Sequence, residues 1–168
     1  MVNRGSRRSA ASFVLGTLLF VASPVLGQGG RTLADWQRDL RDPAVDVRAR
    51  AVQALVAFDR HAVPALTGAL GDKEFRVRAS AAEALVKMGP GHVMPGMIEA
   101  LRSTEAGVRA NAAVVLGAFG PAATPAVPTL AHALRDPNLR VRELAGEALN
   151  RIAPAGRNQP ATLPLNCH

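Results

Sequence analysis

Arginine and a short polar side chain recur together along this chain at a nearly fixed interval. Successive arginines are 30, 31 and 33 residues apart, at Arg48, Arg78, Arg109 and Arg142. Six residues before each arginine stands Asp42, Asp72, Ser103 or Asp136. A short polar side chain at that position can accept a hydrogen bond from an unpaired N–H at the start of a helix. Because serine can cap a helix but carries no charge, capping is the simpler interpretation of this position.

The other side chains that could bind a metal or act as nucleophiles are few and scattered. His61 and His92 fall at nearly equivalent loop positions, where solvated turn residues are far more common than metal ligands, although a weak metal site is the alternative. His132 is expected on a helix beside a basic residue. The one cysteine, Cys167, precedes His168, but haem attachment needs a second cysteine three residues earlier, where the chain has proline. We therefore expect no catalytic residue, no metal site and no cofactor.

The elements that position the arginines are predicted to be pairs of helices. A period of about 30 residues is typical of stacked repeats, and apolar side chains recur at helical spacing within each unit. In the first helix of the first unit, Thr32 and Asp35 suit a capping box. The second helices share an apolar stripe that continues onto an alanine and a leucine in each unit, and it begins at Val47, Val77, Val108 and Val141.

Prolines and glycines mark the expected ends of these helices. Pro64, Pro95 and Pro128 are expected in the first turn of three first helices, where the missing N–H costs little. Gly89 and Gly120 are expected to end two second helices in a left-handed conformation. The two extra residues of the longest interval fall between Gly120 and Pro128, so we expect them in a loop between repeats.

The repeated pattern Asp-Pro-x-x-x-Val-Arg-x-x-Ala-x-x-Ala-Leu resembles the HEAT repeat, in particular its short form in phycobilin lyases. The resemblance covers residues 32–153 and implies an all-α, right-handed α-α superhelix, a solenoid of about four helix pairs. It implies that second helices line a concave face where partners dock. It also implies a ladder of side chains between neighbouring repeats, with Ser103 leaving one rung without a carboxylate, at Asp42, Arg48, Asp72, Arg78, Arg109, Asp136 and Arg142.

Two enzyme classes share such repeats and provide an alternative function. The resemblance to deoxyhypusine hydroxylases would imply iron bound by His-Glu pairs, but no histidine in this chain is followed by glutamate. The resemblance to phycobilin lyases would imply a bound tetrapyrrole, which an exported protein would rarely meet. A HEAT-type oxidoreductase or lyase is therefore the disfavoured alternative.

The first 27 residues are typical of a secretory signal peptide. Three arginines precede an apolar run that Ser23 and Pro24 interrupt. An uncleaved membrane anchor is the alternative, although the run is shorter than the roughly 20 apolar residues that a bilayer requires. We expect cleavage after Gly27 and a periplasmic or extracellular protein. A linker at 28–31, the repeat domain at 32–153 and a disordered, proline-rich tail at 154–168 would follow.

The charge pattern favours a protein partner over a nucleic acid. The formal charge is +7, and the first 27 residues hold three arginines and no acid, so the remainder carries +4. Outward positions of the second helices carry both signs and no aromatic side chain on which a base could stack. We therefore expect an exported, monomeric, non-enzymatic scaffold. Its expected binding face comprises Arg50, Gln53, Ser80, Glu83, Lys87, Asn111, Val114, Leu144, Glu147 and Arg151.

Within this face, Val114 and Leu144 are the expected anchors, because apolar residues exposed beside polar ones often mark contacts. The alternative is that each is a single exposed apolar residue of the kind found on any protein surface.

Overall fold

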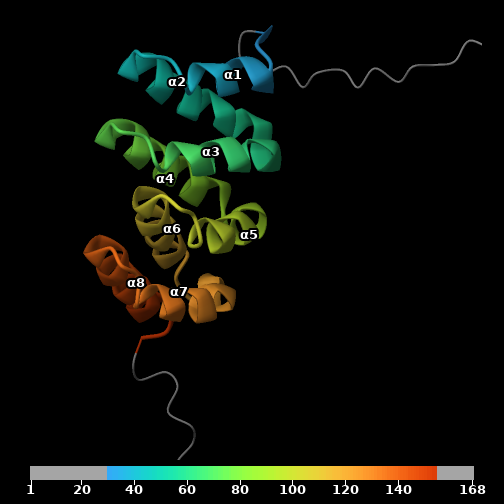
Figure 1. The fold of residues 1–168 in the computed structure, drawn as a ribbon. Helices are drawn as coiled ribbons and strands as arrows, with labels where there is room; N and C mark the ends of the chain where they lie inside the picture. Colours follow the sequence, from blue (N-terminus) through green and yellow to red (C-terminus); the bar gives the residue numbers. More distant parts are fainter. Residues whose placement is uncertain (1–29, 155–168) are drawn as a thin grey trace, which may run out of the picture.

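The structure, a computed structural model, describes residues 30–154. The described chain is an all-α solenoid in which helix pairs stack one upon another, with α1 at one end and α8 at the other (Figure 1). The even-numbered helices follow one another along one side of the stack and the odd-numbered helices along the other. The elements are α1 (Leu33–Asp39), α2 (Val45–Leu55), η2 (Val56–Ala62), α3 (Val63–Ala69), α4 (Phe75–Met88), α5 (Pro90–Ala100), α6 (Ala106–Ala118), η3 (Gly120–Ala126), α7 (Val127–Ala133) and α8 (Leu139–Ile152).

The start of α1 confirms the predicted capping box. The Thr32 N–H donates to the Asp35 carboxylate at 3.0 Å, and the Asp35 N–H donates to the Thr32 hydroxyl at 3.2 Å. Two backbone donors that lack helical partners are thereby satisfied. The hydrogen bonds from Thr32 also lower the pKa of Asp35.

One continuous core runs through the stack, because neither helix of a pair can bury both apolar faces alone. The leucine that ends the repeated stripe is fully buried in the first three units, at Leu55, Leu85 and Leu116. In the last unit Leu149 is only half-buried against the same core. The first helices contribute residues such as Leu66 to the same cluster.

The glycine positions behave as expected, and one proline does not. Gly89 and Gly120 have φ of 81° and 56°, a backbone conformation that is unfavourable for residues with a Cβ atom. Pro64 and Pro128 lie in the first turns of α3 and α7. Pro95, however, lies inside α5, so the prediction for it was wrong. The helix begins five residues earlier because Pro90, directly after Gly89, is itself well suited to a first turn.

The insertion before the last repeat also differs from the prediction. Its two extra residues do not form an irregular loop; they fall within the 3₁₀ helix η3 and the start of α7. A 3₁₀ helix packs alanines such as Ala123 and Ala126 into the core while it connects two α-helices. The register of α7 is thereby preserved.

No helix in residues 30–154 is long and apolar enough to cross a bilayer. The predicted signal peptide, half of the linker and nearly all of the proline-rich tail lie outside the described residues. Cys167 and His168 lie outside them too.

Candidate functional site

The recurring acidic position forms a turn before each second helix and does not occupy the cap position. In three units the side-chain oxygen of Asp42, Asp72 or Asp136 accepts from the N–H two residues later at 2.8 Å. Ser103 makes the same bond to the Glu105 N–H at 3.2 Å. The predicted cap was therefore wrong by two residues. The carboxylate still orders the backbone at the helix start, and its other lone pairs stay available.

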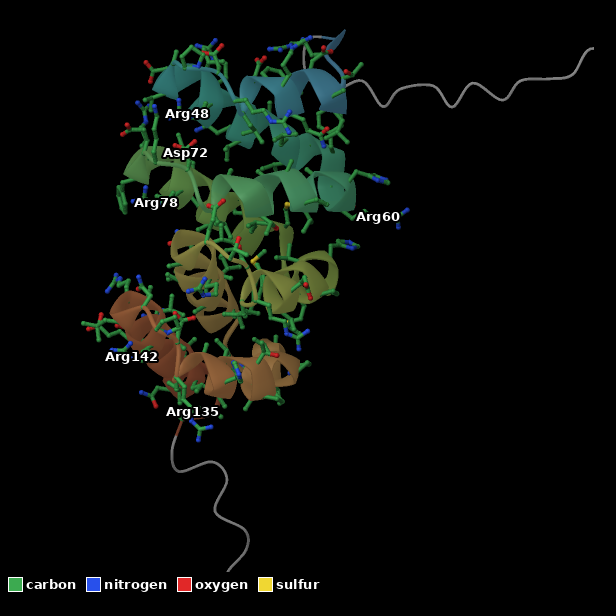
Figure 2. The ribbon with its side chains drawn as sticks, in the orientation of Figure 1. Arg48, Arg60, Asp72, Arg78, Arg135 and Arg142 are labelled. Carbon is green, nitrogen blue, oxygen red and sulfur yellow. The ribbon has the colours of Figure 1, made fainter. Side chains whose placement is uncertain are left out.

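Two rungs of the ladder between repeats are ion pairs with the same geometry. In the first, the Arg48 Nε and Nη2 donate to the two carboxylate oxygens of Asp72 at 2.7 and 3.0 Å. In the second, Arg109 donates in the same way to Asp136 at 2.7 and 2.9 Å. Each arginine therefore reaches the turn of the next repeat, and Figure 2 shows Arg48 facing Asp72 across the junction of α2 and α4.

The third nitrogen of each arginine fixes the guanidinium to its own repeat. The Arg48 Nη1 donates to the carbonyls of Asp42 and Pro43 at 2.9 and 3.0 Å. The Arg109 Nη1 makes the equivalent pair of bonds to Ser103 and Thr104. A filled rung thus ties the turn of one repeat, through one planar group, to the turn of the next.

The pKa shifts of the two aspartates follow from these bonds. Burial would raise the pKa of Asp72, but hydrogen bonds from Arg48 and the Glu74 N–H outweigh it and lower the pKa. For Asp136 the hydrogen bond from Arg109 is the main cause of a lowered pKa, partly opposed by burial. The same bonds raise the pKa of Arg48 and of Arg109. Both carboxylates are therefore charged at neutral pH.

The rung between the second and third repeats lacks its carboxylate. The Arg78 Nη1 donates to the carbonyls of Asp72 and Lys73 at 2.7 and 2.8 Å, as in the filled rungs. Ser103 stands where the partner aspartate would be. Within residues 30–154 the Nε and Nη2 of Arg78 have no hydrogen-bond acceptor, and no carboxylate lies within ion-pair distance. Arg142 makes the same Nη1 bonds, to Asp136 and Pro137.

A different polar contact joins the repeats at this junction. The Asn111 side chain on α6 donates to the Leu70 carbonyl, at the end of α3, at 2.8 Å. That carbonyl belongs to the last turn of a helix and has no helical partner. Asn111, which was expected on an outward binding face, is instead half-buried and joins two repeats.

A groove of about 740 Å³ lies beside the incomplete rung. Its lining combines small residues of the turn and of helices α4 and α6, which we call the floor, with larger side chains. The floor comprises Gly71, Ala79, Ala82, Gly107 and Ala110, and the surrounding residues include Lys73, Phe75, Arg78, Asn111, Val114, Arg140 and Leu144.

Among the lining residues the only acid is Asp72, which Arg48 already holds. The acids of the adjacent turns, Glu74 and Glu105, do not line the groove. Of the lining cations, Arg140 is paired with Glu143 at 3.7 Å, and the Glu105 carboxylate lies close to Gly71. Lys73 and Arg78 are therefore the lining cations that form no ion pair within the described residues.

The predicted binding face is only partly brought together. Asn111, Val114 and Leu144 line the groove, whereas the other seven predicted residues do not. Arg50 and Gln53 are exposed on α2, and Ser80 is half-buried on α4. The remaining four are exposed and form pairs within their own helices, Glu83 with Lys87 at 2.8 Å and Glu147 with Arg151 at 3.9 Å.

The two predicted anchors are less exposed than expected. Leu144 is 7% exposed, so its prediction as an exposed residue was wrong, and Val114 is half-buried against the core. The reason is the close approach of α6 and α8. A Cβ on Gly117 would lie 3.1 Å from the Ala148 Cα, so the two helices can cover side chains beside the core stripe.

The sequence interpretation missed Phe75, which is 74% exposed and lies beside Arg78, with the guanidinium carbon 5.9 Å from the ring centre. The repeat phase contained the signal. The residue three before each ladder arginine is apolar in every unit, at Val45, Phe75, Ala106 and Leu139. It starts the second helix, where a large side chain faces solvent at the edge of the stack.

Within the described residues no three side chains of histidine, cysteine, aspartate or glutamate are grouped as metal ligands would be. His92 approaches Asp59 at 4.0 Å, and both are solvent-exposed. Smaller furrows of about 580 and 490 Å³ lie between α1 and α3 and between α3 and α5.

Solved structures with a similar arrangement include two classes of enzyme. Human deoxyhypusine hydroxylase in complex with glycerol is 27% identical over 73% of this chain and 43% of its own, with a TM-score of 0.53. The chain therefore spans less than half of that protein. The CpcE–CpcF complex of phycocyanin lyase from Nostoc is 22% identical over 73% of this chain and 65% of its own, with a TM-score of 0.38.

A designed armadillo repeat protein in complex with the peptide (KR)4 is 17% identical over 71% of this chain and 64% of its own, with a TM-score of 0.43. A comparison with curated proteins finds no match. The family described as HEAT repeats matches residues 36–94 and 94–165, which is most of the chain. The helix pairs, the repeated turn and the inter-repeat ladder agree with that match, and the protein belongs to the HEAT repeat family.

Proposed function

We propose that this protein is an exported, non-enzymatic HEAT-repeat scaffold that binds another protein through the side of the solenoid formed by its second helices. The observation that carries the proposal is the groove across α4, α6 and α8. It is made of side chains from consecutive repeats, as the binding surface of a solenoid is. Its lining combines an aromatic ring, aliphatic side chains and cations, a composition that suits protein contacts.

The test is partner capture with a variant that fills the groove. Ala79 is exposed on the floor, so Ala79→Arg places a long side chain in the groove without entering the core. Ala131 is also exposed but lies on α7, outside the groove, and Ala131→Arg is the matched control. We expect a partner from the native compartment to be captured by the wild type and by Ala131→Arg but not by Ala79→Arg. Equal capture by all three would exclude this side of the solenoid.

Export is a separate part of the proposal and has its own test. The basic residues and apolar run before Gly27 support cleavage near that residue. N-terminal sequencing of the exported protein should then begin near Gln28. Recovery of the full-length chain from the membrane fraction would support an uncleaved anchor instead.

The enzyme alternative is supported by one observation, the 27% identity to deoxyhypusine hydroxylase over most of this chain. Against it, none of the four histidines is followed by a glutamate. Metal analysis of the purified protein discriminates between the two functions. Iron bound in a fixed ratio to protein would favour the enzyme.

A further inference from the structure

Arg78 is the ladder arginine inside the stack whose carboxylate-binding edge is open. Its Nη1 is held by the carbonyls of Asp72 and Lys73, as in the filled rungs. The Nε and Nη2, which in Arg48 and Arg109 grip both oxygens of an aspartate, have no acceptor among the described residues. Figure 2 shows Arg78 at the same edge of the stack as Arg48 and Asp72, one repeat further along.

This edge is preorganised for a carboxylate. The two carbonyl bonds fix the plane of the guanidinium, so a ligand that binds Nε and Nη2 immobilises little additional side chain. The filled rungs show what fits, since in them the same two nitrogens bind carboxylate oxygens 2.7–3.0 Å away. A bidentate contact of this kind is strong and directional.

The surroundings of Arg78 specify the rest of the ligand. Arg78 lines the groove together with the 74% exposed ring of Phe75 and a floor of alanine and glycine. Lys73 adds positive charge, Arg140 is paired with Glu143 at 3.7 Å, and the one acid in the lining is held by Arg48. The groove is thus complementary to an anionic group with an apolar neighbour.

We propose that Arg78, Phe75 and the hollow between α4 and α6 form a receptor for an aspartate or glutamate side chain of a protein partner, which supplies the carboxylate that Ser103 lacks. An apolar side chain next to that acid packs on Phe75 and the alanine floor. This inference rests on the proposed function, because it identifies the chemistry of the partner that the scaffold binds.

The test uses three single variants of the full chain, one double variant and a displayed library of random twelve-residue peptides. Ser103→Asp supplies the missing carboxylate from within the protein, and Ser103→Asn has the same shape without the charge. Arg78→Gln removes the receptor. We expect Ser103→Asp to raise the melting temperature by a few degrees. We expect no such rise in Ser103→Asn, nor in the double variant that combines Ser103→Asp with Arg78→Gln. This result would show that the edge is open and within reach of residue 103.

In the selection, the wild type and Ser103→Asn should enrich peptides that contain an acid next to an apolar residue. Those peptides should bind Ser103→Asp and Arg78→Gln at least about tenfold more weakly, the loss expected when a charged, hydrogen-bonded partner is removed. Because Ser103→Asp is expected to be more stable than the wild type, its loss of binding cannot arise from unfolding.

Three outcomes would overturn the inference. If the selected peptides show no acidic preference and bind all variants equally, the carboxylate receptor is wrong, although the groove would still be a protein-binding site. If the library yields no acidic peptides and a single-stranded oligonucleotide, assayed separately, binds the wild type but not Arg78→Gln, the edge would be assigned to phosphate. If no peptide binds the wild type and Ser103→Asp does not stabilise it, both this inference and the proposed groove are wrong.

Discussion

Replacement of Asp136 by serine separates the two roles of the ladder carboxylate. The Asp136 side chain accepts from the Asn138 N–H at 2.8 Å and holds both Nε and Nη2 of Arg109. Ser103 shows that a serine at this repeat position still makes the turn bond. Asp136→Ser should therefore keep the turn before α8 and lose only the ion pair.

The size of the loss follows from burial. The side chains of Arg109 and Asp136 are 12% and 9% exposed, so the guanidinium would remain largely desolvated without its partner. Removing one partner of a buried pair costs roughly 3–5 kcal/mol. Because the Arg109 Nη1 keeps its carbonyl acceptors, we expect a loss of about 3 kcal/mol, the lower end of that range. Ser103→Ala, which removes a turn bond alone, should cost only about 0.5–1.5 kcal/mol.

Urea denaturation, monitored by two spectroscopic signals, measures how much stability Asp136→Ser loses and which repeats unfold first. Far-ultraviolet circular dichroism reports all helices, whereas the single tryptophan, Trp36, reports α1 at the opposite end of the stack. Since stability in a solenoid comes largely from contacts between neighbours, Asp136→Ser should loosen the last repeat first. The dichroism transition should then precede the fluorescence transition.

The reasoning would be refuted if Asp136→Ser destabilised the protein no more than Ser103→Ala does. Such a result would mean that the turn bond, and not the pair with Arg109, is what the acidic position contributes. Conversely, if the isosteric variant Asp136→Asn loses as much free energy of unfolding as Asp136→Ser does, the charge of Asp136 is what stabilises the junction.

Three further predictions concern the ladder and the core. The lowered pKa values of Asp72 and Asp136 stabilise the fold above the unfolded value of about 3.9, so the free energy of unfolding should fall as the pH drops below about 4, and fall less in Asp136→Asn. Gly117→Val should lower the melting temperature because its Cβ would meet the Ala148 Cα at 3.1 Å, whereas Gly146→Ala, with only an ordinary contact 3.7 Å from Leu134, should raise it through helix propensity. Leu85→Ala, at a fully buried position, should cost about 2–5 kcal/mol in urea denaturation.

The fold could be predicted because the same helix-forming pattern occurs in four successive repeats. One copy of Val-Arg-x-x-Ala would be weak evidence for a helix, but four copies in phase define a stripe that only stacking can bury. The ends of helices were less predictable where two acceptable starts compete. Pro95 and Pro90 each suit a first turn, and in the structure α5 begins at the earlier one, so that Val93 packs into the core from within the helix.

The binding face was less predictable, because outward positions on a helix depend on the neighbouring helix. Leu144 and Asn111 lie off the core stripe and were therefore expected in solvent. The distance between α6 and α8 buries the first, and the carbonyl of Leu70 engages the second. Neither contact is visible in a periodicity, since each joins residues from different repeats.

Ser103 has two structural consequences, one for its own turn and one for Arg78 of the preceding repeat. Its lack of charge favoured a capping role, which was wrong by two residues, but the serine hydroxyl accepts from the Glu105 N–H and orders the turn before the helix. The same lack of charge leaves Arg78 without a carboxylate, while Asn111 supplies another polar contact at that junction. The Nη1 of Arg78 still fixes the turn of its own repeat, whereas its Nε and Nη2 form no contact between the described repeats. An arginine that is held in place with one edge unused is the kind of group that a binding surface can use.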